Sequence, residues 1–220
     1  AAVLGVDTLS AMVYFGFRSL GLVSPFPSTP FDKNRKGLTL GECAACLVVE
    51  DEESARNRGA DIHARLMGFG MTSDAHHITA PDPEGKGIKL CMRKALGNAG
   101  LDASRIDAIN AHGTGTPQND EVEGKAIADV FGPDVPVTST KSFTGHTLGG
   151  AGAVEAIFSI LSIKGAFLPP TLGTKDIPED IRANIVTGEV LKKDISTVLS
   201  TSFGFGGSNA SLVFGRYEKK

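Results

Sequence analysis

The sequence predicts an α/β fold built around a mixed sheet. Short apolar segments typical of strands alternate along the chain with longer segments whose apolar residues recur at helical spacing. Glycine is abundant, with 27 residues among 220, as expected where many tight turns connect such elements. Hydrophobic residues make up 41% and charged residues 21%, which is ordinary for a globular protein with a real core. Alternating strands and helices of this kind form layered α/β structures.

The first fifty residues are expected to form two strands and a helix. Residues 1–6 are apolar from the start and indicate a buried strand; without Met or a polar lead-in, they predict that the chain is a fragment. Residues 7–20 carry apolar side chains at helical spacing. The segment 21–36, rich in proline, serine and charge, indicates a surface loop. Residues 38–50 are expected to form an apolar strand.

The middle of the chain alternates between the two kinds of element. Residues 51–59 begin with acidic residues and end with arginines, which suits the dipole of a helix. A strand is expected at 64–70, and a helix at 85–100 shows one apolar face and ends at a glycine. A further strand is expected at 106–111.

The last part of the chain again alternates between helices and strands. A helix at 121–131 is expected to be capped by Asn119 or Asp120, and a helix at 149–164 is almost wholly apolar and therefore central. The remaining expected strands, of which the last two close the chain around a glycine-rich turn, are 135–140, 195–202 and 209–214. With these strands and helices, the sequence predicts a mixed sheet covered by helices.

Charge and composition exclude several classes of partner. The net charge of −3 offers no basic field for nucleic-acid binding. The longest apolar run, residues 151–167, is interrupted by Glu155 and Lys164, so no membrane segment is expected. Three cysteines and no signal peptide predict a cytoplasmic protein with reduced thiols.

Neither the cysteines nor an aspartate–histidine cluster predicts a metal site. Cys43 and Cys46 form a C-x-x-C pair, but it lies in an apolar strand and lacks the second pair that a zinc site requires, so both are expected to be buried. Asp74, His76 and His77 share one loop, where such residues more commonly form a hydrogen-bonded turn. We therefore expect no metal.

Two histidines lie in glycine- and threonine-rich segments. His112 follows a short strand in NAHGTGTP, and His146 follows the next strand in KSFTGHTLGGAG. Side chains at strand ends meet ligands in α/β folds, although two surface-loop histidines remain the plain alternative. The glycine-rich loop at 203–209 precedes a strand instead of a helix, which disfavours dinucleotide binding and favours backbone N–H groups that hold an oxyanion.

Three motifs together resemble a known family. AHGTGTP, KSFTGHTLGGAG and SFGFGGSNAS, in that order and spacing, are similar to the C-terminal half of β-ketoacyl-acyl-carrier-protein synthases, condensing enzymes of the thiolase superfamily. GVDTLS, PFDKNRKGLTLGE and GFGMTSDAHHITAP also match, so the resemblance covers nearly the whole chain. It implies a thiolase-like layered fold with a mixed sheet. Residues 1–50 would end the N-terminal half and residues 51–220 would form the C-terminal half.

The resemblance implies a decarboxylative Claisen condensation of malonyl carrier protein with an acyl group held on a cysteine, in fatty-acid or polyketide and polyene chain elongation. His112 and His146 match the two histidines that donate N–H groups to the thioester oxygen, and Lys141 matches the lysine that orients the site. Glu123 matches the acidic partner of that lysine, and Phe205 matches a gating phenylalanine whose N–H assists the oxyanion hole. The alternatives are a solvated glutamate and a core aromatic.

Further matches concern the substrate and its carrier. Thr114 and Thr116 match threonines that bind the pantetheine amides, and Thr79 and Gly206 are expected to line the same tunnel. Arg18 matches a basic residue that meets the acidic carrier protein, although a surface arginine would look the same. No cofactor is implied beyond the phosphopantetheine that the carrier brings.

One departure from the family pattern concerns the nucleophile. The family cysteine lies at a helix start in a stretch like T-A-C-S-S-S, whereas Cys43, Cys46 and Cys91 lie in other motifs. Either a separate segment supplies the nucleophile or this is a cysteine-free relative. The expected partners are the carrier protein, the missing N-terminal half and a second ketosynthase subunit in a homodimer or heterodimer.

Two functions thus remain, an enzyme and a non-catalytic chain-length factor that partners a ketosynthase. Chain-length factors usually lose the histidines, and both are present here, which favours the enzyme. The segments DTLSAM, HITAPDPEGKG and TPQNDEVE resemble the aryl-polyene type more than fatty-acid synthases.

Overall fold

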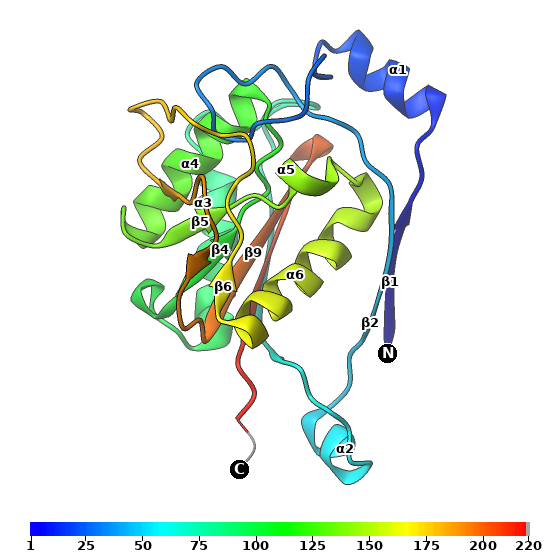
Figure 1. The fold of residues 1–220 in the computed structure, drawn as a ribbon, viewed down its shortest axis with the longest axis vertical. Coiled ribbons are helices and arrows are strands. Elements are labelled where there is room, and N and C mark those ends of the chain that lie inside the picture. Colours follow the sequence, from blue (N-terminus) through cyan, green and yellow to red (C-terminus); the bar gives the residue numbers. More distant parts are fainter. Residues whose placement is uncertain (219–220) are drawn as a thin grey trace.

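The protein is built of layers (Figure 1). The computed structural model describes residues 1–218. Helices α3 (Lys86–Ala99) and α4 (Pro117–Phe131) cover one face of a six-stranded sheet, and α6 (Ala151–Gly165) covers the other. A two-stranded antiparallel sheet of β1 (Ala2–Asp7) and β2 (Cys43–Val48) packs on the far side of α6. The predicted α/β class is confirmed.

The central sheet is mixed, as predicted. Its strand order is β3-β10-β9-β4-β5-β7. The strands span Arg65–Ser73 (β3), Ala108–Asn110 (β4), Pro136–Thr138 (β5), Asn184–Ile185 (β7), Thr197–Gly204 (β9) and Ser208–Gly215 (β10). β10 pairs antiparallel with both β3 and β9, whereas β9, β4, β5 and β7 run parallel. β4 and β5, which precede the two histidines, therefore lie side by side.

Smaller elements connect these layers. They are α1 (Ala11–Ser19), α2 (Glu52–Asn57), α5 (Lys141–Thr144), β6 (Phe167–Leu168), β8 (Leu191–Lys192) and 3-10 turns at Ala103–Arg105, Leu148–Gly150 and Phe205–Gly207. β6, β7 and β8 were not predicted, because a two-residue strand has no periodicity to detect. The strand expected at 38–50 begins only at Cys43, and the helix expected at 7–20 is shorter at both ends.

Helix α4 begins four residues earlier than predicted. Its N-cap is Thr116 and Pro117 occupies the first turn, where the missing N–H of proline costs nothing. The expected cap at Asn119 or Asp120 is therefore wrong. Asp120 is instead a buried acceptor, bonded to the backbone N–H of Phe31 at 2.7 Å and to that of Gly115 at 3.1 Å.

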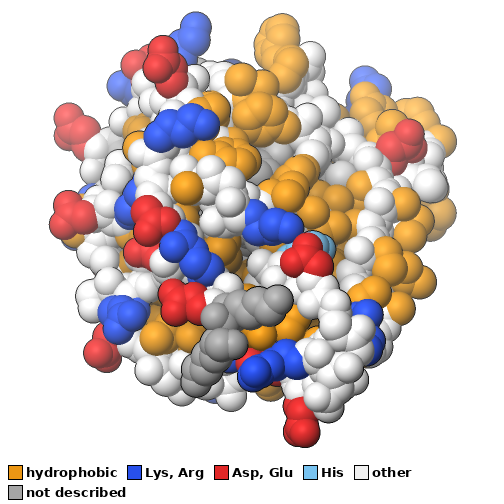
Figure 2. Space-filling model, turned by 60° about the horizontal axis from the view of Figure 1, so that its bottom comes forward, with side chains coloured by type: hydrophobic (Ala, Val, Ile, Leu, Met, Phe, Trp, Pro, Cys, Tyr) orange, Lys and Arg blue, Asp and Glu red, His pale blue; other side chains and the backbone are white. Residues whose placement is uncertain are grey.

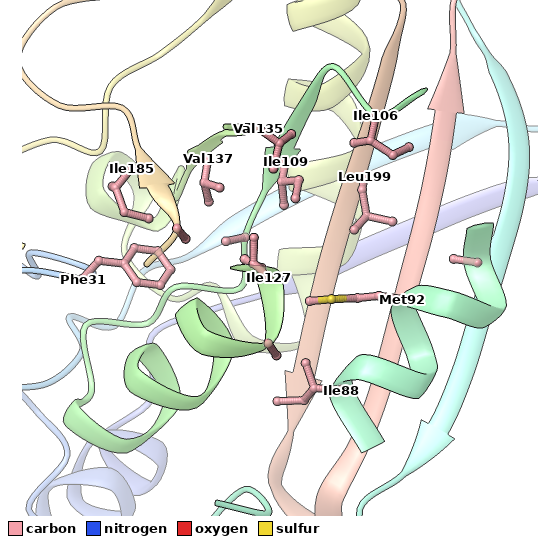
Figure 3. Packing of buried hydrophobic residues seen from close by; sticks show 14 of the residues in the cluster. Phe31, Ile88, Met92, Ile106, Ile109, Ile127, Val135, Val137, Ile185 and Leu199 are labelled. Atoms are coloured by element: carbon pink, nitrogen blue, oxygen red, sulfur yellow. The ribbon is translucent and has the colours of Figure 1, made fainter. Parts of the chain in front are cut away.

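The larger apolar core fills the space between the sheet and helices α3 and α4 (Figure 3). Ile88 and Met92 of α3, Ile127 of α4, Leu199 of β9 and Val137 of β5 all belong to this core. Phe31 closes this core from the loop between α1 and β2, and it is fully buried. The loop predicted on the surface thus sends one aromatic side chain inside.

Helix α6 occupies the central position that its apolar sequence predicts. The stretch Leu148–Gly165 is long and apolar enough to cross a membrane by composition, but here it is a core helix between β9 and the β1–β2 sheet. Its buried face is not purely apolar, since Glu155, Ser159 and Ser162 lie on it. The helix is thus almost wholly apolar in composition, as expected, but one side of its buried face carries polar groups.

An apolar surface remains open on the outer sheet. Val3, Leu4, Val6 and Val48 are all exposed on β1 and β2. Figure 2 shows hydrophobic side chains gathered along this side of the molecule, whereas acidic and basic side chains intermingle elsewhere on the face shown. The chain exposes 11120 Å², and a compact monomer of this size is expected to expose roughly 9600 Å².

Candidate active site

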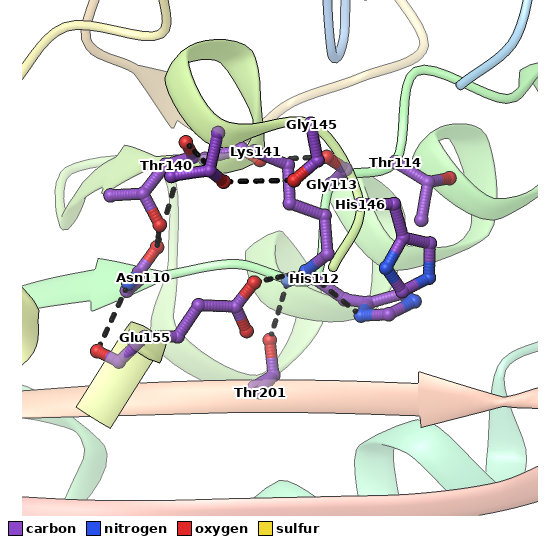
Figure 4. Close-up of polar contacts among 12 residues, drawn as sticks. Asn110, His112, Gly113, Thr114, Thr140, Lys141, Gly145, His146, Glu155 and Thr201 are labelled. Carbon is purple, nitrogen blue, oxygen red and sulfur yellow. Dashed lines mark hydrogen bonds and ion pairs between the residues drawn. The ribbon is translucent and has the colours of Figure 1, made fainter. Parts of the chain in front are cut away.

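The two predicted histidines lie together at the ends of neighbouring parallel strands. His112 follows β4 and His146 follows β5 and α5. Their ring centroids are 5.2 Å apart, with the rings nearly perpendicular (Figure 4). This arrangement agrees with the prediction of one shared pocket. It follows from topology, because the carboxyl ends of parallel strands meet at one sheet edge.

The position of His146 is fixed by its backbone and by one ring nitrogen. Its N–H donates to the carbonyl of Thr39 at 2.7 Å. Gly145 adopts a φ of 69°, and a Cβ there would lie 2.9 Å from the Thr39 oxygen, so this turn requires glycine. The N–H of Leu148 donates to Nδ1 of His146 at 3.2 Å. Because a backbone N–H can only donate, the neutral ring carries its proton on Nε2.

Lys141 fixes the ring of His112 in the same way. Its Nζ lies 3.2 Å from Nδ1 of His112 and also forms an ion pair with the carboxylate of Glu155. An ammonium has only donors, so Nδ1 of His112 accepts and Nε2 bears the proton. Both imidazoles therefore keep an Nε2–H that is free to donate to a ligand.

Burial and the nearby ammonium keep both rings neutral. Burial and, after it, the charge of Lys141 together lower the pKa of His146 from 6.5 to about 3. Burial, then Lys141, then His146 hold the pKa of His112 well below its usual range. Two neutral N–H donors at neutral pH follow from these surroundings.

The predicted partner of Lys141 is wrong. The ion pair runs to Glu155 of α6, and Glu123 of α4 does not take part in it. Both members of the pair are 2% exposed. Glu155 escaped prediction because α6 was read as an apolar core helix. A single carboxylate on the inward face of such a helix was the available signal, since buried charges require a partner.

Glu123 holds the backbone that carries His112. Its carboxylate accepts the N–H groups of His112 at 2.8 Å and Gly113 at 2.7 Å, and the hydroxyl of Thr201 at 2.9 Å. Complete burial raises the pKa of Glu123 to about 7, although these donors act in the opposite direction. Glu123 is therefore a buried anchor of the site and not the solvated glutamate of the alternative interpretation.

The two predicted threonines lie in the segment that Asp120 anchors. The hydroxyls of Thr114 and Thr116 are 2.9 Å apart, and both side chains are buried. Ser28 donates its hydroxyl to the carbonyl of Thr114 at 2.9 Å. Binding of a pantetheine amide by these hydroxyls stays a prediction.

The glycine-rich loop lies beside the segment that carries Thr79. Gly206 donates its N–H to the carbonyl of Ile78 at 2.7 Å, and Asp74 donates its N–H to the carbonyl of Gly207 at 2.8 Å. The structure thus brings Gly206 next to the segment that carries Thr79, and the expectation that the two residues line a common tunnel stays a prediction.

The aromatic ring against the histidines is not the predicted one. Phe203 lies 5.7 Å from the His112 ring centroid, whereas Phe205 is half exposed and packs on Phe17 of α1 at 5.5 Å. β9 ends at Gly204, so Phe205 belongs to the following turn and leaves the direction of the strand. Nothing in the local sequence distinguishes Phe203, which continues β9, from Phe205, which belongs to the turn. Arg18 lies next to Phe17 on the exposed surface of α1.

The cysteines lie away from this constellation. Cys91 is buried on α3 and donates to the carbonyl of Gly70 at 3.2 Å. Cys43 packs where a Cβ on Gly150 would stand. Cys46 is exposed, so the expectation that both members of the C-x-x-C pair are buried is wrong. None of the three is a hydrogen-bond partner of His112 or His146 among the residues described.

Comparison with known proteins agrees with this geometry. The family model described as "Beta-ketoacyl synthase, C-terminal domain" matches residues 63–175, slightly more than half of the chain. The chain is 48% identical over 192 residues to a 3-oxoacyl-[acyl-carrier-protein] synthase 2 of Coxiella burnetii, a match that covers 86% of the chain and 46% of the relative. The chain therefore spans about half the length of the curated relatives it matches.

Two solved structures are similar over almost the entire chain. The ishigamide ketosynthase/chain length factor matches with a TM-score of 0.93 and 39% identity, covering 99% of this chain and 54% of that one. A type II polyketide synthase acyl-carrier protein in complex with its ketosynthase, AntDE:AntF, matches with a TM-score of 0.94 and 30% identity, covering 99% and 56%. The fold is thus the thiolase-like fold of ketosynthases, and the chain belongs to the β-ketoacyl synthase family, of which it carries the C-terminal domain.

Proposed function

We propose that the protein containing this chain is a β-ketoacyl-acyl-carrier-protein synthase. It would condense malonyl carrier protein with an acyl-enzyme thioester, with loss of CO₂. The observation that carries the proposal is the pair of neutral imidazoles whose Nδ1 atoms are both occupied, by Leu148 N–H and by Lys141. That arrangement leaves two Nε2–H donors available to one oxygen.

In the proposed reaction the bond between the malonyl carboxylate and its α-carbon breaks and CO₂ leaves. The electron pair passes into the thioester as an enolate, whose oxygen accepts from His112 and His146. The enolate carbon then attacks the acyl thioester, a carbon–carbon bond forms and the enzyme thiolate leaves. Donors fixed before the reaction stabilise the developing charge without reorganisation. Lys141 keeps the donating tautomer of His112 and keeps both rings neutral.

The acyl group would be carried by a cysteine outside this chain. Cys43, Cys46 and Cys91 lie in other surroundings, and the relatives are about twice as long as this chain. We therefore propose that an N-terminal half of the synthase supplies the nucleophile. The reaction needs no cofactor other than the phosphopantetheine that the carrier brings, and we propose a cytoplasmic location.

The proposed macromolecular partners are the acyl carrier protein and a second subunit. The AntDE:AntF structure supports a carrier-protein partner, and the ishigamide ketosynthase/chain length factor supports a heterodimer, with a homodimer as the alternative. Thr114, Thr116, Thr79 and Gly206 would contact the pantetheine arm, and Arg18 on exposed α1 would meet the acidic carrier. For the pathway we propose aryl-polyene elongation, which product analysis would test.

A non-catalytic chain-length factor is the second candidate. It has less support, because both histidines and Lys141 are present and hydrogen-bonded in a way that serves the reaction. A partner without activity would not require either tautomer to be fixed.

The test uses the protein as its gene encodes it, with any partner subunit. His112→Ala and His146→Ala should each reduce decarboxylation of radiolabelled malonyl carrier protein by roughly 10²–10³. Loading of an acyl group from its carrier should be affected far less, since that step depends on the thiolate and backbone donors. His63→Ala, an exposed histidine outside the site, is the matched control. Equal loss of loading and decarboxylation would contradict the assigned roles.

A further inference from the structure

Helix α1 touches the glycine-rich loop through one side chain. Met12 and Phe15 of this helix are 86% and 60% exposed, and α1 contains no fully buried residue. Phe17 is half-buried, and its ring lies 5.5 Å from that of Phe205 with 31° between the planes. This tilted contact between two large rings lies within the range of favourable aromatic pairs.

Within residues 1–218, backbone hydrogen bonds and an aromatic contact hold the loop that carries Phe205. On one side, the backbone bonds of Gly206 to Ile78 and of Gly207 to Asp74 secure it. Gly206 and Gly207 have φ values of 81° and 75°, which other residues adopt only with strain. A Cβ at Gly206 would meet nothing within 4 Å, so the space on that side of the glycine is open. On the other side the Phe205 side chain rests on Phe17.

The loop continues directly into the histidine site. Phe203, two residues before Phe205, contacts the ring of His112 at the end of β9. A shift of Phe205 therefore acts on backbone that is continuous with the wall of the site. The ring of Phe17 is in contact with the exposed end of this loop.

We propose that Phe17 is a positioning residue that holds the Phe205 loop in place and thereby sets how readily the enzyme accepts an acyl group. This inference rests on the function proposed above. Without the Phe17 ring the loop moves more freely, and its backbone donors are less well placed when an acyl thioester arrives. Decarboxylation depends on His112 and His146, which are anchored by Leu148, Lys141 and Glu123, and is expected to continue.

The first test is a double-mutant cycle in the complete protein. Phe17→Ala should slow acyl loading about two- to tenfold, the range that an aromatic pair supplies, and change malonyl decarboxylation less than twofold. Phe17→Tyr, which keeps a ring, should restore loading. In a Phe205→Ala background, Phe17→Ala should have almost no further effect, and Met12→Ala should be neutral in both backgrounds. An equal effect of Phe17→Ala with and without the Phe205 ring would overturn the proposal.

The second test does not depend on activity. The chain has no tryptophan, so Phe17→Trp introduces a reporter at the contact, with the fluorescence of the protein lacking it subtracted. Its emission should be blue-shifted and protected from acrylamide, and Phe205→Ala should remove that protection. If Phe17→Trp fails to fold by circular dichroism, Phe205→Trp with and without Phe17→Ala gives the same comparison. If the tryptophan were equally protected from acrylamide with and without the other aromatic ring, the contact between positions 17 and 205 would be refuted. If that protection depended on the other ring but the protein had no condensing activity, only the proposed function would be refuted.

Discussion

At the scale of single residues, the site is defined by which ring nitrogens are already occupied. Protonating Nδ1 of His146 would set its new N–H against the N–H of Leu148, and protonating His112 would set one against Lys141. Both additions place two donors face to face. The surroundings therefore keep each imidazole in its neutral form, with the donor on the side of the ligand.

This leads to a prediction about pH. Because the pKa of His146 lies at about 3 and that of His112 well below 6.5, malonyl decarboxylation should not decline as pH falls through 6.5. The acid limb of the rate profile should lie well below that value. In Lys141→Met/Glu155→Leu the nearby ammonium is absent, so the histidine pKa values rise and the limb should move to higher pH. A limb near 6.5 that both proteins share would contradict this account.

The buried pair of Lys141 and Glu155 gives a prediction about stability. Glu155→Gln leaves an ammonium buried without its counter-charge and should lower the free energy of unfolding by about 3–5 kcal/mol. Lys141→Met/Glu155→Leu removes both charges and should recover most of that loss, as measured by urea unfolding. Glu121→Gln breaks the exposed pair with Lys125 and should cost less than about 1 kcal/mol. If Glu155→Gln cost no more than Glu121→Gln, Glu155 would not be the partner that Lys141 requires.

Site residues that lie inside a sequence motif could be predicted. Site residues that reach the site from another helix or strand could not. His112, His146 and Lys141 stand in recognisable segments, and they meet because β4 and β5 are adjacent. Glu155 and Phe203 enter the site from α6 and β9, where nothing in the local sequence states which side chain faces inward. The resemblance to the family assigned Glu123 to Lys141, whereas the ion pair depends on how α6 packs.

At the scale of elements, glycines decide how closely β3 approaches α3. A Cβ on Gly70 would lie 2.1 Å from the carbonyl oxygen of Cys91, and one on Gly68 would lie 2.5 Å from that of Ala95. These obstacles are backbone atoms and cannot rotate away. The helix lies flat on the sheet edge only because neither strand position has a side chain.

Two alanine substitutions on this pair of elements should therefore have opposite signs. Gly70→Ala must push α3 away from β3 and should destabilise the protein by about 1–3 kcal/mol. Gly97→Ala lies on α3 where a Cβ meets nothing within 4 Å, and it should stabilise the helix by up to about 1 kcal/mol. Thermal unfolding of the two variants checks both signs. A neutral Gly70→Ala would show that α3 and β3 are not in close contact in solution.

Which elements could be predicted depended on their length and periodicity. Helix α3 appeared almost where its apolar face and terminal glycine place it, because fourteen residues display the helical period clearly. The short strands β6, β7 and β8 exist only through pairing with distant segments and leave no local pattern. The start of α4 was misplaced since Pro117 was read as part of a loop, although proline is favoured in a first helical turn.

At the scale of the whole molecule, the described chain presents more surface than its size requires. The β1–β2 sheet has only two strands, and such a sheet is marginal in water unless something covers it. On its inner side it packs closely on α6, where a Cβ on Gly5 would lie 2.6 Å from that of Ala153. On its outer side Leu4, Val6 and Val48 face solvent.

The chain expressed by itself should therefore self-associate. Exposed apolar patches of several hundred Å² drive association in water, so analytical ultracentrifugation should show species larger than a monomer, and a hydrophobic dye should bind. Adding the N-terminal half of the Coxiella burnetii relative should reduce both signals if that half covers the β1–β2 sheet. Leu4→Lys/Val48→Glu should favour the monomer, whereas Lys86→Glu, in an exposed pair far along the chain, should not. A monodisperse monomer that binds no dye would contradict the prediction, because it would mean that this surface needs no cover.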